Sequence, residues 1–163
     1  MIFQAHRGVC CETPENTMPA FVAALEQGYQ IIELDVSVTK DLKFVTLHDN
    51  TINRTARLDS GEPLADTVNI WDITYQEALA YDYGVWFSKK FKGTKIPLFE
   101  DVLKFAKQNG IKTIFYQAET DGRQAAAFAA ELGGQAVMLD PLSERYIENL
   151  ESMAAAIASA KGE

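Results

Sequence analysis

The chain is poor in several chemically informative residue types. Among its 163 residues it has only two histidines and two cysteines, and the cysteines, Cys10 and Cys11, are neighbours. A disulfide between adjacent residues is strained, so the sequence predicts two free thiols rather than a disulfide framework. The chain also lacks any apolar run of the length that a membrane-spanning helix needs, so no membrane span is predicted.

Positive charge is scarce as well. The chain has 15 lysines and arginines against 23 aspartates and glutamates, which gives a formal net charge of −8. Because non-specific nucleic-acid binding needs a basic surface, this balance argues against a nucleic-acid partner. A small phosphate-bearing substrate stays compatible, since a local arginine or a bound cation can outweigh the overall charge. Residues 1–6 show no signal-peptide pattern, so we expect a cytoplasmic protein.

Strand-like and helix-like segments alternate along the sequence. The predicted strands are 2–5, 31–38, 44–47, 113–117 and 136–139, and the predicted helices are 18–27, a helix beginning at 74, 99–109, 122–132 and 143–160. This alternation predicts an α/β fold, with a parallel sheet of about five strands and outer helices. The sheet would form either a partial TIM-like barrel (a half-barrel) or a flattened, doubly wound layer. Because a half-barrel exposes its inner face, we also expect a homodimer as one way to cover it.

The composition changes along the chain. The last third is richer in alanine and contains no histidine, cysteine or tryptophan, and no linker-like stretch marks the change near residues 110–113. We therefore predict one domain over residues 1–163, made of two parts, 1–112 and 113–163, that share a single sheet.

The two histidines lie at the ends of two predicted strands. His6 follows the first strand and His48 the third, while the strand between them carries Glu33 and Asp35 on one face. Ligands of parallel α/β sheets bind at the carboxyl ends of the strands, so we expect these side chains to lie on the functional edge.

These residue types suit phosphodiester hydrolysis. Two carboxylates can hold a hard cation, two imidazoles can divide the base and acid roles, and Arg7 can bind phosphate oxygens through paired N–H groups. Each residue also has a structural alternative. A strand-end histidine is often structural, and Glu33 and Asp35 could instead form a salt bridge with Arg7.

The segment 50–97 has weaker periodicity. Thr74 and Glu77 have the spacing of a capping box, which predicts a helix that begins there. Trp71, Trp86 and Phe91 are expected either in the core or at a substrate mouth, and the lysines of 89–95 on a solvated face.

Residues 2–112 contain many short motifs in a characteristic order. They include His6-Arg7-Gly8, Pro14-Glu15-Asn16-Thr17, Ile32-Glu33-Leu34-Asp35-Val36, His48-Asp49 and Asn53-Arg54-Thr55. With them, this part of the chain resembles the glycerophosphodiester phosphodiesterase family. The resemblance implies a TIM barrel, a divalent cation such as Ca²⁺ or Mg²⁺, and cleavage of small glycerophosphodiesters to sn-glycerol 3-phosphate and an alcohol.

The resemblance also implies roles for particular residues. The implied metal ligands are Glu33 and Asp35, and the implied acid–base pair is His6 and His48. Arg7 would be a catalytic residue that binds the phosphate. Asn16 would bind substrate and, like Asp49, position neighbouring groups. The family has a Glu-x-Lys motif on the next strand, which residues 113–117 lack, and Glu119 is the candidate for the missing metal ligand.

Residues 113–161 resemble the C-terminal lobe of metal-binding solute-binding proteins of ABC transporters. The resemblance implies that Asp140 of this chain could supply a metal ligand. The join suggests a chimera. Three functions therefore stay open from the sequence. They are a metal-dependent phosphodiesterase with full or reduced turnover, a catalytically inactive hybrid fold, and a binder of metal or phosphate.

Overall fold

The computed structural model of the chain describes residues 3–117, 122–140 and 146–159. The chain divides into two compact units, Met1–Val102 and Leu103–Glu163, which are described here one after the other. Helix α3 (Phe99–Gln108) belongs to the segment in which the first unit ends and the second begins. The expected single domain stays a prediction.

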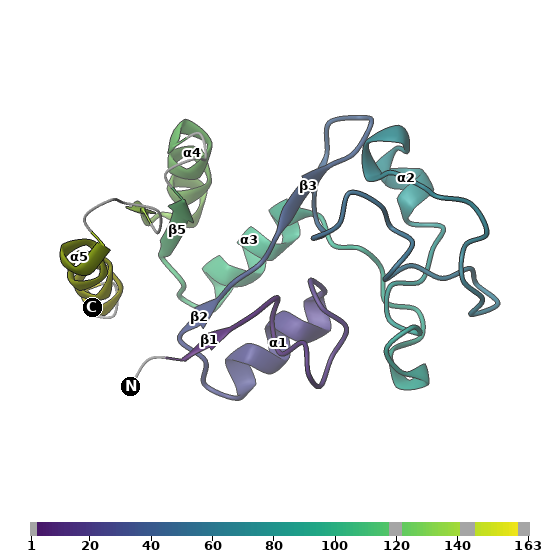
Figure 1. Ribbon diagram of the computed structural model, residues 1–163, viewed down its shortest axis with the longest axis horizontal. Coiled ribbons are helices and arrows are strands. Elements are labelled where there is room, and N and C mark those ends of the chain that lie inside the picture. Colours follow the sequence, from purple (N-terminus) through teal and green to yellow (C-terminus); the bar gives the residue numbers. More distant parts are fainter. Residues whose placement is uncertain (1–2, 118–121, 141–145, 160–163) are drawn as a thin grey trace. The chain divides into compact units, whose positions relative to one another are not determined.

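The first unit begins with a strand, a helix and a parallel strand. Strands β1 (Gln4–Ala5) and β2 (Ile31–Ile32) pair in parallel and lie side by side, and helix α1 (Met18–Glu26) connects them (Figure 1). Pro19 lies in the first turn of α1, where its missing N–H costs no helical hydrogen bond. Gly28 follows the helix with a φ of 75°, as glycine often does at a helix end. This arrangement confirms the beginning of the predicted α/β pattern.

The predicted strand 31–38 is interrupted. After β2 the chain resumes strand geometry only at β3 (Val36–Val38). Between them, the backbone N–H of Asp35 donates to Asn16 Oδ1 at 3.2 Å instead of to a strand partner. A side chain thus replaces one bond of the strand ladder, which the alternation of apolar residues could not reveal.

Strand β3 pairs with β4 (Phe44–Thr46) in an antiparallel hairpin. The connection of residues 39–43 is far shorter than a parallel crossover needs, so the strands must run in opposite directions. Within the turn, the Thr39 hydroxyl donates to Asp41 Oδ1 at 2.6 Å, and the Thr39 N–H donates to the Lys43 carbonyl at 2.9 Å. In the described residues the strands form three two-stranded sheets, so the predicted five-stranded parallel sheet is wrong there, although the α/β class is confirmed.

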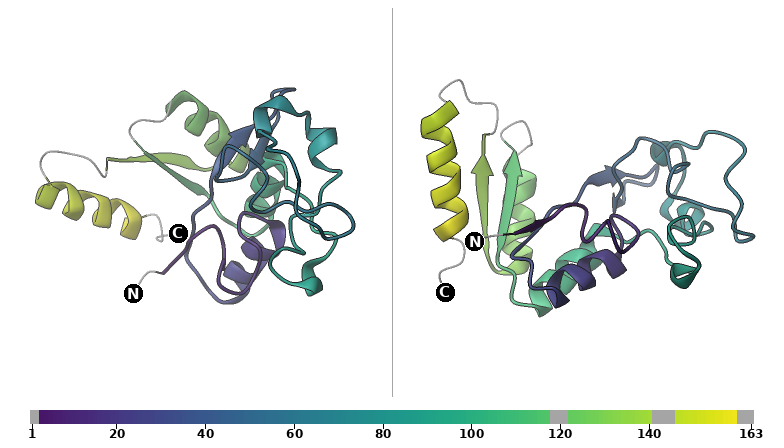
Figure 2. Two further views of the ribbon diagram at one scale, coloured as in Figure 1. Left: turned by 45° about the vertical axis from the view of Figure 1, so that its right-hand side comes forward. Right: turned by 60° about the horizontal axis from the view of Figure 1, so that its bottom comes forward.

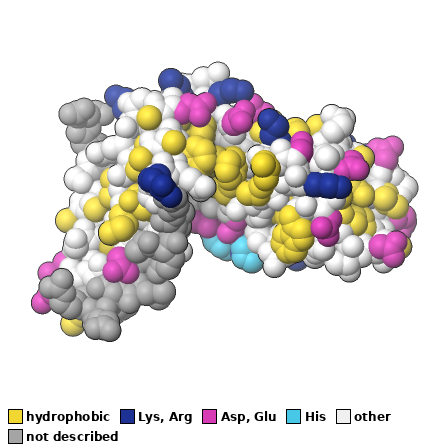
Figure 3. Space-filling model, turned by 90° about the horizontal axis from the view of Figure 1, so that it is seen from above, with side chains coloured by type: hydrophobic (Ala, Val, Ile, Leu, Met, Phe, Trp, Pro, Cys, Tyr) yellow, Lys and Arg dark blue, Asp and Glu magenta, His cyan; other side chains and the backbone are white. Residues whose placement is uncertain are grey.

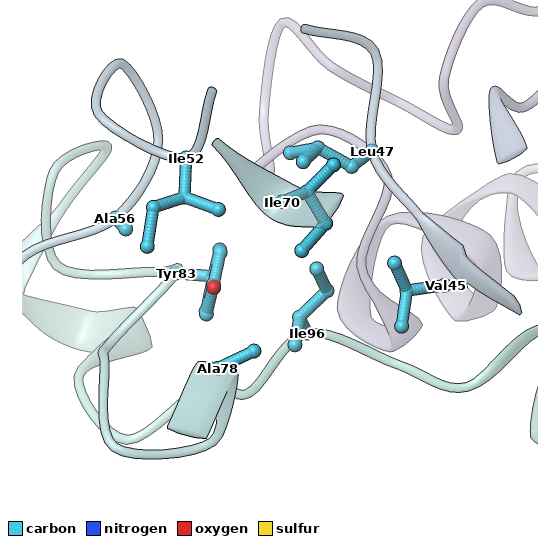
Figure 4. Close-up of a cluster of buried hydrophobic side chains, with 8 residues drawn as sticks. All are labelled: Val45, Leu47, Ile52, Ala56, Ile70, Ala78, Tyr83 and Ile96. Carbon is cyan, nitrogen blue, oxygen red and sulfur yellow. The ribbon is translucent and has the colours of Figure 1, made fainter. Parts of the chain in front are cut away.

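The main core of the first unit lies between the hairpin and the long segment that follows it. Its side chains point toward one another around Tyr83 and Ile70 (Figure 4). The buried members are Val45, Leu47, Ile52, Ala56, Ile70, Ala78, Tyr83 and Ile96. Two short turns of 3₁₀-helix, Ile70–Asp72 and Lys89–Phe91, and helix α2 (Tyr75–Ala78) belong to this segment. The predicted capping box of Thr74 and Glu77 begins α2, as expected.

Two further expectations for this segment have different outcomes. Trp71 is 49% exposed, so core packing is wrong for this residue. Trp86 is partly buried, donates its Nε1–H to the Tyr83 carbonyl and packs edge-on against Phe87. The lysines of 89–95 are exposed, as predicted.

The second unit contains a second parallel pair. Strands β5 (Thr113–Gln117) and β6 (Gln135–Leu139) lie side by side, joined by helix α4 (Gly122–Leu132), and helix α5 (Tyr146–Ser159) follows (Figure 2). The observed bounds of β5 and α4 agree with the predicted ones. Among the helices of the described ranges, none combines the length and the apolar character that crossing a bilayer requires. Cys10 and Cys11 are free thiols, as predicted.

Candidate active site

The loop after β1 turns sharply beneath helix α1. Arg7 has a φ of 53° and Gly8 a φ of 76°, both in the left-handed region. A Cβ on Gly8 would lie 2.5 Å from the Cβ of Ala20 on α1, so only glycine fits there. This close contact fixes the backbone that carries His6 and Arg7.

Arg7 and Asn16 hold the two candidate metal ligands. The Arg7 backbone N–H donates to Glu33 Oε2 at 2.9 Å, and Asn16 Nδ2 donates to Asp35 Oδ2 at 2.9 Å. Arg7 Nε lies 3.3 Å from the same Asp35 oxygen, an ion pair without hydrogen-bond geometry. The structure thus brings together four of the residues that the sequence singled out, and the salt-bridge alternative for Asp35 is also correct.

A row of alternating charges continues from Arg7. Arg7 Nη1 donates to Glu15 Oε1 at 2.9 Å, and Arg54 donates to both oxygens of Glu15 at 2.8 Å. Arg54 also binds Asp49, with its Nε 2.6 Å from Oδ2 and its Nη2 3.2 Å from Oδ1. Asp49 Oδ1 in turn lies 2.6 Å from Nδ1 of His48. Arg7 and His48 are therefore connected through three intervening charged side chains.

These contacts change the acidity of the two carboxyl groups in the row. Hydrogen bonds from Arg54, followed by those from Arg7, hold the pKa of Glu15 below its ordinary value despite partial burial. The pKa of Asp49 falls to about 2, chiefly because of hydrogen bonds from Arg54 and then from His48. The same carboxylates raise the pKa of Arg54. All three groups are therefore charged at neutral pH.

Glu33 and Asp35 suit a hard cation through their free oxygens. One oxygen of each carboxylate is hydrogen-bonded, whereas Glu33 Oε1 and Asp35 Oδ1 accept no hydrogen bond from the described part of the chain. Mg²⁺ is often held by only two carboxylates, with water and substrate phosphate as the other ligands. Within the described ranges, no group of three or more potential ligand side chains is present. Glu119 lies outside the described residues.

The two histidines differ in their surroundings. His48 is bound to Asp49, but His6, which is exposed, makes no hydrogen bond or ion pair to the residues that the structure describes. Histidine side chains reach the surface beside acidic ones (Figure 3). A cavity of about 10 Å³ lies next to His48, lined also by Glu15, Thr55 and Tyr83, and is far too small for a phosphodiester.

The similarity of this chain to known proteins extends beyond the short sequence motifs. Residues 6–139 match the model of the glycerophosphoryl diester phosphodiesterase family. The chain belongs to this family. Because the match runs on to residue 139, the phosphodiesterase family also accounts for residues 113–139 of the alanine-rich part. The resemblance of that part to solute-binding proteins is not supported.

Among curated relatives, a glycerophosphodiester phosphodiesterase of Caldanaerobacter subterraneus subsp. tengcongensis is 41% identical over 100 residues, covering 61% of this chain and 38% of the relative. An enzyme of that name from Bacillus altitudinis is 38% identical over 104 residues, covering 64% of this chain and 39% of the relative. The chain thus spans about two fifths of the length of the curated relatives it matches.

Two solved phosphodiesterase structures resemble this chain over part of their own length. The enzyme from Agrobacterium tumefaciens is 29% identical with a TM-score of 0.68, over 96% of this chain and 64% of that one. An Oleispira antarctica phosphodiesterase, solved with the product sn-glycerol-3-phosphate, has a TM-score of 0.68 at 18% identity, over 98% of this chain and 81% of that one.

Sequence reasoning missed two members of the site, Glu15 and Arg54. Both belong to motifs that carried the family resemblance, but neither was given a role. Their motif membership was the available signal. Their function as links between Arg7 and Asp49 follows only from the three-dimensional contacts.

Proposed function

We propose that this chain carries the metal-dependent hydrolytic site of a glycerophosphodiester phosphodiesterase. The reaction would convert a glycerophosphodiester and water into sn-glycerol 3-phosphate and an alcohol. One observation carries the proposal. Beyond the ends of the parallel strands β1 and β2, the Arg7 backbone N–H binds Glu33 and the Asn16 side chain binds Asp35, so the two carboxylates are held at one site. Family membership supports the reaction type, and the product bound in the Oleispira antarctica relative supports the substrate class.

Each residue has a defined task in this proposal. Arg7 would bind phosphate oxygens, helped by Asn16, which keeps the neighbouring Asp35 carboxylate in place. One of His6 and His48 would take a proton from the attacking water, and the other would give a proton to the departing alkoxide oxygen. Asp49 would orient the His48 ring through Nδ1.

Glu33 and Asp35 would hold the cation, Ca²⁺ or Mg²⁺, through their free oxygens. When bound, the cation would neutralise phosphate charge and polarise the phosphoryl group. Glu119 is a further candidate ligand. Besides the cation, Arg7 would supply positive charge to the phosphate.

The test is hydrolysis of glycerophosphocholine, followed by enzymatic detection of glycerol 3-phosphate, with Ca²⁺, with Mg²⁺ and with EDTA. We expect cation-dependent product that the double variant His6→Ala/His48→Ala abolishes. Asp35→Asn should abolish the cation-dependent formation of product, because it removes a proposed cation ligand. Asp59→Asn, the same change at an exposed residue, should leave product formation unchanged. Equal background from the wild type and the double variant would favour the inactive alternative, which family membership does not favour.

A further inference from the structure

The chain from Arg7 to His48 has one residue at its centre that binds two carboxylates at once. Arg54 uses Nε and Nη2 for Asp49, and Nη1 and Nη2 for Glu15. Lysine could not reproduce this, because its ammonium is a single point of charge and not a planar fork. These four hydrogen bonds distinguish Arg54 from a surface arginine that only contacts solvent.

We infer that Arg54 is a positioning residue for His48. It holds Asp49 in place, and Asp49 in turn holds the His48 ring in the tautomer that carries its proton on Nδ1. The inference rests on the proposed function, because it concerns the histidine to which that function assigns proton transfer.

In the contact between His48 and Asp49, the Asp49 carboxylate is the hydrogen-bond acceptor. Asp49 is ionised at neutral pH and therefore only accepts hydrogen bonds. The 2.6 Å contact between Asp49 Oδ1 and His48 Nδ1 consequently requires the proton on Nδ1. Nε2 of the neutral ring then has a free lone pair, which can take a proton from water and later return one to a leaving oxygen.

Asp49 is held in place by its side-chain hydrogen bonds. Its oxygens accept side-chain hydrogen bonds from Arg54 and His48, and from no other side chain that the structure describes. The Asp49 side chain is 28% exposed, so without Arg54 it could turn toward water. Arg54 thus donates the two side-chain hydrogen bonds that, besides the contact with His48, hold the Asp49 carboxylate.

Arg54 is in turn held in place by Glu15. Glu15 is only 12% exposed and accepts hydrogen bonds from both Arg7 and Arg54. Asn16, the next residue, binds Asp35. The segment that holds a candidate metal ligand therefore also holds the arginine that orients His48, so the two halves of the site share one support.

The decisive experiment measures the His48 tautomer and does not depend on turnover. The ¹⁵N shifts of both ring nitrogens are recorded at pH 8, where an ordinary imidazole is neutral, and His6→Gln assigns the His48 signals. Arg54→Gln removes the fork and Arg54→Lys keeps only the charge. Arg57→Gln is the matched control, because Arg57 Nη1 donates only to the backbone carbonyls of residues 53, 54 and 56.

We expect the wild type and Arg57→Gln to carry the proton on Nδ1. Arg54→Gln should move it toward Nε2, the tautomer that free histidine favours, and Arg54→Lys should lie between them. The inference is overturned if the wild type already favours Nε2–H, or if Arg54→Gln keeps the wild-type tautomer. Should Arg54→Gln fail to fold, the same comparison is made with Arg54→Lys.

Kinetics supply the second readout. With glycerophosphocholine, Arg54→Gln should lower kcat about tenfold to hundredfold while KM changes less than about threefold, because the change affects proton transfer more than binding. Adding His48→Ala should then cost far less than it does in the wild type. If the wild type shows no hydrolysis, the proposed function fails, whereas the tautomer comparison still decides the role of Arg54.

Discussion

Asp82 allows the sharpest test of what holds the long segment after the hairpin. The residue is 4% exposed, and its Oδ1 accepts the backbone N–H groups of Gly84 and Val85 at 2.8 Å each. Oδ2 accepts the N–H of Gly93. The Asp82 backbone also pairs with Arg57 through two hydrogen bonds, at 2.8 and 2.9 Å.

The expected cost of Asp82→Ala follows from these contacts. In this variant, the N–H groups of Gly84, which is buried, and of Val85, which is half-buried, lose an acceptor that water replaces poorly. The N–H of Gly93 is in an exposed residue, so water can bind it instead. At about 1–2 kcal/mol for each donor left without its charged acceptor, unfolding free energy should fall by about 3 kcal/mol. Asp82→Asn keeps the two Oδ1 contacts but sets an N–H₂ group against Gly93, so its cost should be about 1 kcal/mol.

The dependence on pH has a definite sign. Burial raises the pKa of Asp82, but the N–H donors of Gly93, Val85 and Gly84 outweigh it and leave the pKa below its ordinary value. The stabilisation is therefore present above the unfolded pKa of about 3.9 and is lost as the pH falls through the lower folded value. The difference between wild type and Asp82→Asn should consequently shrink in acid.

Urea unfolding followed by tryptophan fluorescence measures these differences, since Trp86 is bonded to the same segment. Asp59→Asn, at an exposed residue, is the control and should change stability by less than about 0.5 kcal/mol. A cost below about 1 kcal/mol for Asp82→Ala, or equal costs for the alanine and asparagine variants, would refute the reasoning.

Three further predictions concern single positions. Gly8→Ala should cost more than about 3 kcal/mol in urea unfolding, whereas Gly28→Ala, with a similar φ but open space around it, should cost only about 1 kcal/mol; equal costs would exclude a clash with α1. Asp49→Asn should weaken the loss of stability between about pH 4 and pH 2, because the pKa of Asp49 is lowered in the fold; an unchanged acid unfolding curve would contradict this. Thr74→Ala should cost about 1 kcal/mol by removing the capping box, and no change in the urea midpoint would argue against it.

Local signals predicted local structure well. Pro19 and Gly28 marked the ends of α1, the Thr74 and Glu77 spacing marked α2, and the bounds of β5 and α4 agree with the expected ones. In each case the controlling contacts lie within a few residues, so the sequence contains the information directly.

The errors arose where a distant side chain decides the outcome. Strand 31–38 is broken because Asn16 takes the N–H of Asp35, and no periodicity shows a partner 19 residues away. The hairpin of β3 and β4 could have been recognised from the short connection, and with it the departure from a parallel sheet. Glu15 and Arg54 escaped notice because an ion pair 39 residues apart exists only in the folded chain.

The backbone at residues 7 and 16 has a consequence for laboratory evolution. Arg7 and Asn16 both adopt positive φ, at 53° and 54°, which costs a residue with a Cβ about 1 kcal/mol or more relative to glycine. Leu42, at the exposed tip of the hairpin, adopts a φ of 60° as well. A selection for heat resistance alone would therefore favour glycine at Leu42, whereas at Arg7 and Asn16 the relieved strain competes with the loss of the side-chain hydrogen bonds to Glu15 and Asp35. Only at Leu42 would that gain leave the site intact, so such a library should be screened for hydrolysis and melting temperature together.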